Sequence, residues 1–127
     1  MEDKKKIILI VDDELPNINV YRAILNKHGY RVYGAQDGAH ALDMVKKHSP
    51  HLILLDLLMP NVHGFDVLKQ IRANEEYNGI KIIIMSGVYT NASFQLQARQ
   101  EGAIEFMAKP IDPPTLLERV KEHLLDV

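Results

Sequence analysis

Five short apolar runs constrain the fold of this chain more than any other feature of its sequence. Between them lie segments whose apolar residues recur every three or four positions. A short continuous apolar run is typical of a strand covered on both faces, and the three-to-four spacing is typical of an amphipathic helix. Strands and helices therefore alternate, which predicts an α/β protein with a parallel sheet, helices on both faces and right-handed crossovers.

The apolar runs give the expected strands, and turn and capping residues mark the expected helices between them. We expect strands at Ile7–Val11, Arg31–Ala35, Leu52–Asp56, Ile80–Met85 and Ile104–Ala108. We expect helices from Pro16 to Gly29, from Gly38 to Ser49, after Gly64, at Asn91–Glu101, and after the capping residue Asp112. Five (βα) units are too few for a closed barrel, so we predict an open doubly wound sheet of flavodoxin-like order 2-1-3-4-5.

Helical spacing also predicts which residues of the first helix face the core. Ile18, Tyr21 and Leu25 recur at this spacing, and we expect Val20 and Ile24 to widen the same apolar face.

Length and composition favour one domain and exclude several kinds of protein. The chain has 127 residues, which fits a single domain over residues 1–127. A formal net charge of −2 gives no electrostatic reason to expect nucleic-acid or membrane binding. No apolar run approaches the length of a membrane span, and the absence of cysteine excludes thiol catalysis and is compatible with a cytoplasmic location.

Chemically capable side chains follow four of the five expected strands. Asp12 and Asp13 come directly after the first strand, Asp56 ends the third, Ser86 follows the fourth, and Lys109 follows the fifth. In open α/β sheets, sites form outside the carboxyl ends of the strands. If the strand order is 2-1-3-4-5, these side chains converge on one shallow crevice.

The charges of this group predict a metal site and a phosphoryl acceptor. Three carboxylates within about 5 Å repel one another by roughly 3 kcal/mol per pair at an effective dielectric near 20, so they require a cation. Oxygen ligands alone favour Mg²⁺, with Mn²⁺ as a second candidate. An Asp can act as a nucleophile and form an aspartyl phosphate, and the metal and Lys109 would neutralise the phosphoryl oxygens.

These residues form a motif set that resembles the response regulator receiver family of two-component signalling. The set consists of Val11-Asp12-Asp13-Glu14, Asp56-Leu57-Leu58-Met59-Pro60 with Gly64, Met85-Ser86-Gly87, and Lys109-Pro110. The resemblance extends from Ile7 to Leu124. It implies a phosphorylation switch that is not a classical enzyme but catalyses its own Mg²⁺-dependent phosphorylation and dephosphorylation.

The resemblance also implies a role for each site residue. Asp12, Asp13, Asp56 and the backbone carbonyl of Leu58 would hold Mg²⁺. Asp56 would accept phosphoryl from a histidine kinase, a phosphotransfer protein or a small donor such as acetyl phosphate.

Further implied roles concern the response to the phosphoryl group. Lys109 would bind the phosphate. The Lys109–Pro110 peptide is expected to be cis. Ser86 would swing toward the phosphate, and Phe106, in place of the commoner Tyr, would be the aromatic switch that moves inward.

The readout surface is expected on the helix at 91–101, the strand at 104–108 and the last helix, where a downstream target or output domain would bind. We expect no output domain in this chain, and the sequence leaves open whether it is a stand-alone receiver or part of a larger regulator. It also leaves open whether phosphorylation drives homodimerisation.

Three other functions fit the sequence less well. A haloacid-dehalogenase-type phosphatase places a second Asp two residues after its nucleophile, where this chain has Leu58. A flavodoxin needs a phosphate-binding loop after the first strand, where Asp12 and Asp13 would repel a phosphate. A phosphorylation-independent module on the same fold would usually lack one of the acidic residues or Lys109.

Two apolar residues beside the site predict a long-lived phosphoryl group. Leu58 and Val88 each lie two residues past a site residue, at positions that are often polar in this family and affect access of the hydrolytic water. We expect them to hinder that water and slow self-dephosphorylation. A loss of phosphate as fast as that of chemotaxis receivers, measured on the isolated phosphoprotein, would contradict this hypothesis.

Overall fold

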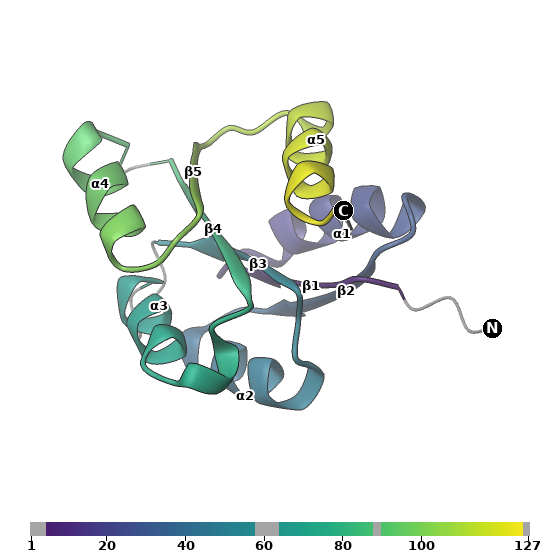
Figure 1. Ribbon diagram of the computed structural model, residues 1–127. Helices are drawn as coiled ribbons and strands as arrows, with labels where there is room; N and C mark the ends of the chain where they lie inside the picture. Colours follow the sequence, from purple (N-terminus) through teal and green to yellow (C-terminus); the bar gives the residue numbers. More distant parts are fainter. Residues whose placement is uncertain (1–4, 58–63, 88–89, 126–127) are drawn as a thin grey trace.

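The computed structural model describes residues 5–57, 64–87 and 90–125, and these form five strands and their connecting helices (Figure 1). The strands are β1 (Ile7–Val11), β2 (Arg31–Ala35), β3 (Leu52–Asp56), β4 (Lys81–Ser86) and β5 (Glu105–Ala108). The helices are α1 (Leu15–Lys27), α2 (Gly38–His48), α3 (Gly64–Arg72), the short 3-10 helix η1 (Glu75–Tyr77), α4 (Ala92–Gln100) and α5 (Pro113–His123).

The strands form one parallel sheet in the order β2-β1-β3-β4-β5, which confirms the predicted topology. The chain reverses its direction of travel across the sheet between β2 and β3, so β1 and β3 are neighbours at the centre. This is the switch point at which doubly wound folds place their sites, at the carboxyl ends of the strands.

Two apolar layers cover the sheet because successive side chains of a strand point to opposite faces. Ile8 and Ile10 of β1 belong to the core layer that also contains residues of α1 and α5, whereas Leu9 and Val11 belong to the layer that contains residues of α2, α3 and α4. Every residue of β3 is buried, as its continuous apolar run predicts.

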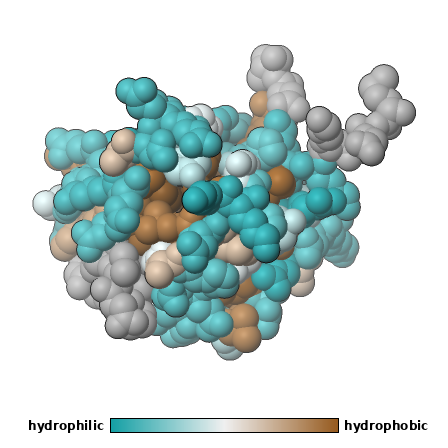
Figure 2. Space-filling view, turned by 90° about the horizontal axis from the view of Figure 1, so that it is seen from below, coloured by the Kyte–Doolittle hydropathy of each residue, from teal (hydrophilic) through white to brown (hydrophobic). Residues whose placement is uncertain are grey.

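Figure 2 views the molecule from the side on which Figure 1 shows α2 and α3. That surface is mostly hydrophilic, with a small hydrophobic patch near its centre. None of the described helices is long and apolar enough to span a membrane.

Helix capping follows the sequence closely. The Asp112 carboxylate accepts the backbone N–H of Thr115 at 3.1 Å, so Asp112 is the predicted cap of α5. Asp37 and Asn91 cap α2 and α4 in the same way. Such caps satisfy backbone donors that a helix leaves unpaired in its first turn.

Two expected strand starts and one expected helix face were wrong. β5 begins at Glu105 and not at Ile104. Ile80 does not begin β4, because its N–H bonds to the carbonyl of Tyr77 and closes the turn after η1, a helix that the sequence analysis missed. Val20 does not widen the apolar face of α1, because it is 53% exposed. It lies two residues from Ile18, a rotation of roughly 200° around the helix.

Arg72 joins three segments at the edge of the sheet opposite the carboxyl ends. Its guanidinium donates to the carbonyls of Gly102 at 3.1 Å, Tyr77 at 3.1 Å and Ile80 at 2.6 Å. Gly102 has φ of +107°, and a Cβ atom there would lie 2.8 Å from both Cγ and Nε of Arg72. The turn before β5 therefore depends on a glycine for two separate reasons.

We predict that Gly102→Ala lowers the free energy of unfolding more than Gly29→Ala does. Gly29 also has a positive φ, +93°, but a Cβ there would meet no described atom within 4 Å, so it measures the backbone strain alone. We expect a loss of about 1 kcal/mol at Gly29 and at least about 2 kcal/mol at Gly102. Urea denaturation checks this, and equal losses at the two positions would show that the Arg72 contact is unimportant.

Candidate functional site

The sheet register brings the predicted site residues to one edge. Val11 of β1 pairs with Leu55 of β3, and Ser86 of β4 pairs with Ala108 of β5. The residues that follow these positions therefore emerge side by side. Since parallel strands all point the same way, residues distant in sequence meet here without any irregular backbone.

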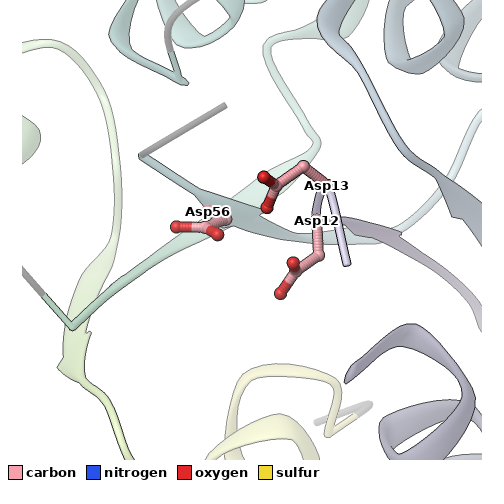
Figure 3. Close-up of side chains that lie close together, drawn as sticks. All are labelled: Asp12, Asp13 and Asp56. Carbon is pink, nitrogen blue, oxygen red and sulfur yellow. The ribbon is translucent and has the colours of Figure 1, made fainter. Parts of the chain in front are cut away.

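The carboxylates of Asp12, Asp13 and Asp56 form a tight cluster at this edge, with one oxygen of each within 4.8 Å of the others (Figure 3). Asp12 is fully buried and Asp56 is 6% exposed, whereas Asp13 is exposed. Unpaired buried carboxylates are costly, so the cluster needs positive partners.

Lys109 supplies that positive charge. Its Nζ lies 2.9 Å from Oδ2 of Asp12 and 3.3 Å from Oδ2 of Asp56. Burial lowers the pKa of Lys109, but the hydrogen bonds and negative charges of the two carboxylates outweigh that effect and hold its pKa above the ordinary value. The Lys109 ammonium is therefore charged at neutral pH.

Ser86 and Pro110 adjoin Lys109, and Phe106 lies three residues before it on β5. Ser86 is fully buried, and its carbonyl accepts the backbone N–H of Lys109 at 2.8 Å. The Lys109–Pro110 peptide is cis, as the family resemblance implies. Phe106 is partly buried and packs against the core between the sheet and helices α2, α3 and α4.

Gly64 shows why a glycine begins α3 beside the site. A Cβ atom there would lie 2.5 Å from the carbonyl oxygen of Asp56 and 2.6 Å from Cα of Leu57. Its own N–H donates to the carbonyl of Leu57 at 3.0 Å. Only glycine allows the helix to approach the end of β3 this closely.

The cluster fits a hard divalent cation. Carboxylate oxygens are the ligands that Mg²⁺ prefers, and Asp12, Asp13 and Asp56 can each offer one oxygen to a shared centre. The fourth predicted ligand, the Leu58 carbonyl, lies outside the described residues, as does Val88. The metal role of Leu58 and the effect of both residues on phosphate lifetime stay predictions.

The sequence analysis missed two residues that border the site, Asn17 and Tyr21 of α1. The Asn17 amide lies 3.3 Å from Oδ2 of Asp12. Burial raises the pKa of Tyr21, and the carboxylates of Asp12 and Asp56 raise it further although Lys109 lowers it. One sequence feature could have identified Asn17: it lies in the first turn of the helix that directly follows Asp12 and Asp13.

A groove beside Lys109 opens between α1 and the segment that leads into α5. It has a volume of about 480 Å³ and is lined by Asn17, Val20, Tyr21, Gly87, Lys109, Pro110, Ile111 and Pro113. Val20 is exposed and lines this groove together with Lys109, so the groove combines an apolar side chain with the charged one.

Comparison with known proteins identifies the family. A family model described as Response regulator receiver domain matches residues 8–121. The chain belongs to this family.

Individual receiver proteins match over nearly the whole chain. The polar-differentiation response regulator DivK of Brucella ovis is 31% identical over 121 residues, which cover 95% of this chain and 98% of the relative. The structure of the Vibrio cholerae chemotaxis protein CheY4 superposes with a TM-score of 0.89 at 28% identity, covering 95% of this chain and all of that one. A CheY-like receiver from Methanospirillum hungatei gives 0.86 at 30% identity, with 94% and 93% covered.

This is therefore a receiver domain of a response regulator in two-component signalling. Members of this family are not classical enzymes, and they generally bind Mg²⁺. Membership also implies a kinase partner and output partners.

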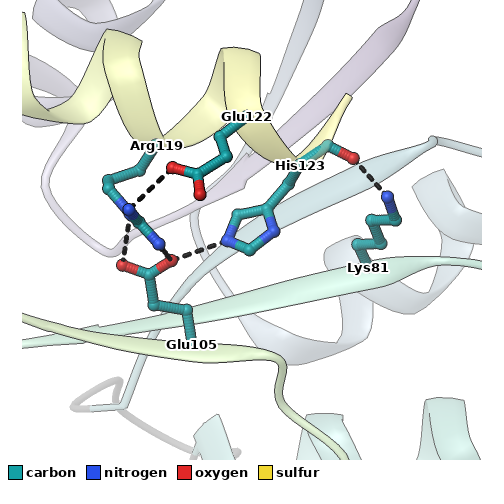
Figure 4. A network of polar contacts seen from close by, with 5 residues as sticks. All are labelled: Lys81, Glu105, Arg119, Glu122 and His123. Atoms are coloured by element: carbon teal, nitrogen blue, oxygen red, sulfur yellow. Dashed lines mark hydrogen bonds and ion pairs between the residues drawn. The ribbon is translucent and has the colours of Figure 1, made fainter. Parts of the chain in front are cut away.

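A second polar cluster ties α5 of this receiver domain to the sheet (Figure 4). The Glu105 carboxylate at the start of β5 accepts two hydrogen bonds from the Arg119 Nε at 2.8 and 3.0 Å, one from its Nη2 at 2.8 Å, and lies 2.6 Å from Nε2 of His123. Arg119 also pairs with Glu122, and the Lys81 ammonium donates to the carbonyl of His123. Burial raises the pKa of Glu105, but the hydrogen bonds and charges of Arg119 and His123 outweigh it and hold the pKa below its ordinary value of 4.5.

We predict an acid-dependent loss of stability that originates at Glu105. Because its folded-state pKa is depressed, the carboxylate stabilises the fold above pH 4.5, and the contribution disappears as the pH falls through the folded-state pKa. Glu105→Gln should therefore lower the free energy of unfolding at neutral pH, and its difference from the unmodified protein should shrink on acidification. Urea titrations from about pH 7 to about pH 3.5 check this.

The matched control is Glu76→Gln, since Glu76 is exposed. A Glu105→Gln deficit that stays constant across the same pH range would contradict the assignment.

Proposed function

We propose that this receiver domain is the phosphoacceptor of a two-component or phosphorelay system, and that Asp56 receives the phosphoryl group in a Mg²⁺-dependent reaction. The observation that carries the proposal is the contact of Lys109 with both Asp12 and Asp56, at 2.9 and 3.3 Å, inside the three-carboxylate cluster. Phosphorylation would turn the Asp56 carboxylate into an acyl phosphate with a charge of about −2, and a positive group already in contact with Asp56 can neutralise part of that charge.

The chemistry assigned to the chain is a displacement at phosphorus. An oxygen of the Asp56 carboxylate attacks the phosphorus, the bond to the donor nitrogen or oxygen breaks, and its electron pair leaves with the donor. The Lys109 ammonium moves toward the phosphoryl oxygens, and the Ser86 hydroxyl donates to them. A bound Mg²⁺ supplies further neutralisation of the phosphoryl charge. The same groups would support hydrolysis of the aspartyl phosphate.

The metal ligands follow from position and charge. Asp12 and Asp13 bring two carboxylates from the end of β1, and Asp56 brings the third from β3. The Leu58 carbonyl is proposed as the fourth ligand from the protein. An all-oxygen ligand set suits Mg²⁺ and admits Mn²⁺.

The donor is a phosphohistidine on a kinase or phosphotransfer protein, or a small acyl phosphate. The groove lined by α1 and Lys109–Pro113 borders Lys109, which contacts Asp56, and it carries apolar contact area at Val20 and Ile111. Leu15, on the first turn of α1, is also exposed at 47%. A protein donor would approach Asp56 from the side of the site where α1 and this groove lie.

The face formed by α4, β5 and α5 transmits the signal to a binding partner. New contacts of Ser86 and Lys109 with the phosphoryl group would favour a second conformation, in which Phe106 moves inward. That conformation would bind a downstream target or output domain, or a second copy of the domain. Residues 1–127 act as one receiver unit in this proposal.

We predict that incubation with Mg²⁺ and acetyl phosphate adds one phosphoryl group, detected by intact-protein mass spectrometry. Asp56→Asn should abolish the gain, because an amide cannot act as the nucleophile. Asp66→Asn is the matched control, since Asp66 is exposed on α3, and it should accept the group normally. No gain with any donor, including a phosphorylated phosphotransfer protein, would overturn the proposed function.

A further inference from the structure

The Asp12 carboxylate is held by three donors among the described residues. Oδ1 accepts the backbone N–H of Glu14 at 2.9 Å. Oδ2 accepts both the Lys109 ammonium at 2.9 Å and the side-chain amide of Asn17 at 3.3 Å. Since Asp12 is fully buried, each donor that it loses must be replaced or its charge becomes expensive to maintain.

The contact of Lys109 with Asp12 would weaken during the proposed reaction. Its ammonium is already divided between Asp12 and Asp56. A phosphoryl group on Asp56 brings oxygens that compete for the same donor. When Lys109 turns to them, Oδ2 of Asp12 keeps one donor from the described residues, the Asn17 amide.

Helix capping does not account for the direction of the Asn17 side chain. Glu14 is the N-cap of α1, so Asn17 is the third residue of the helix, where a polar side chain commonly reaches back to the N-cap N–H. Here Asp12 takes that N–H. The Asn17 amide instead lies between two carboxylates, 3.3 Å from Asp12 and 3.4 Å from Oε2 of Glu14.

We propose that Asn17 is a positioning residue for the phosphoryl site, whose amide keeps the Asp12 carboxylate in place to hold a divalent cation, both in the unphosphorylated protein and after Lys109 has moved to the phosphoryl group. The inference rests on the proposed function. An amide suits this task because it donates a hydrogen bond without adding a positive charge that would repel the cation. Outer partners of this kind orient metal ligands and strongly affect metal affinity.

The test compares Asn17→Ala with Asn19→Ala, a matched substitution of an exposed Asn on the same helix. Mg²⁺ affinity of the unphosphorylated protein is measured by calorimetry, with Asp13→Ala as the reference for a lost ligand. We expect the dissociation constant for Mg²⁺ to rise about tenfold in Asn17→Ala and to stay unchanged in Asn19→Ala. The rate of phosphorylation by acetyl phosphate at saturating Mg²⁺ should also fall in Asn17→Ala.

Asn17→Leu provides a second variant that keeps the side-chain volume but removes the donor, and it should lose Mg²⁺ affinity to the same extent. Urea denaturation of each variant separates this effect from a loss of folding. Equal Mg²⁺ affinities in the Asn17 and Asn19 variants overturn the inference. If the unmodified protein binds no Mg²⁺ and accepts no phosphoryl group, the proposed function itself fails.

Discussion

The ion pairs of Lys109 with Asp12 and Asp56 are the interaction on which the rest of this structure depends. Three carboxylates crowd the carboxyl edge of the sheet, and two of them are buried. Such a group repels itself and is desolvated as well, so it persists only with a cation among its members. The same ammonium that stabilises the cluster is the group that a phosphoryl oxygen would attract away. The cluster is therefore compact, and under the proposed function phosphorylation of Asp56 would rearrange it.

Ion pairs hold the strand β5 near both of its ends. Lys109 directly follows its last residue and contacts β1 and β3 through Asp12 and Asp56. Glu105, its first residue, contacts α5 through Arg119 and His123. Phe106 lies between these two anchors. Phe106, the proposed switch residue, thus lies on a short strand with charged contacts to the carboxylate cluster after its last residue and to α5 at its first.

Much of the fold follows from local sequence, and the departures from it have physical causes. The apolar run at 52–55 predicts β3 correctly because both faces of that strand are covered. Asp112 likewise predicts the cap of α5. Val20 was misassigned because apolar character alone does not give the angle around a helix. η1 was missed because a single 3-10 turn has no periodicity to detect. The contact of Asn17 with Asp12 depends on how α1 leaves β1, which no local pattern specifies.

By itself the sequence determined the alternation of strands and helices, the acidic and basic residues at the strand ends, and membership in the receiver family. These are properties of residue type and spacing, which do not depend on distant contacts. Only the tertiary structure decided which strand ends are neighbours in space, that Lys109 divides its ammonium between two buried carboxylates, and that Asn17 completes the shell of Asp12. The reason is that hydrogen bonds and ion pairs require atoms within about 3 Å, and positions 12, 56 and 109 reach that distance only when the sheet assembles.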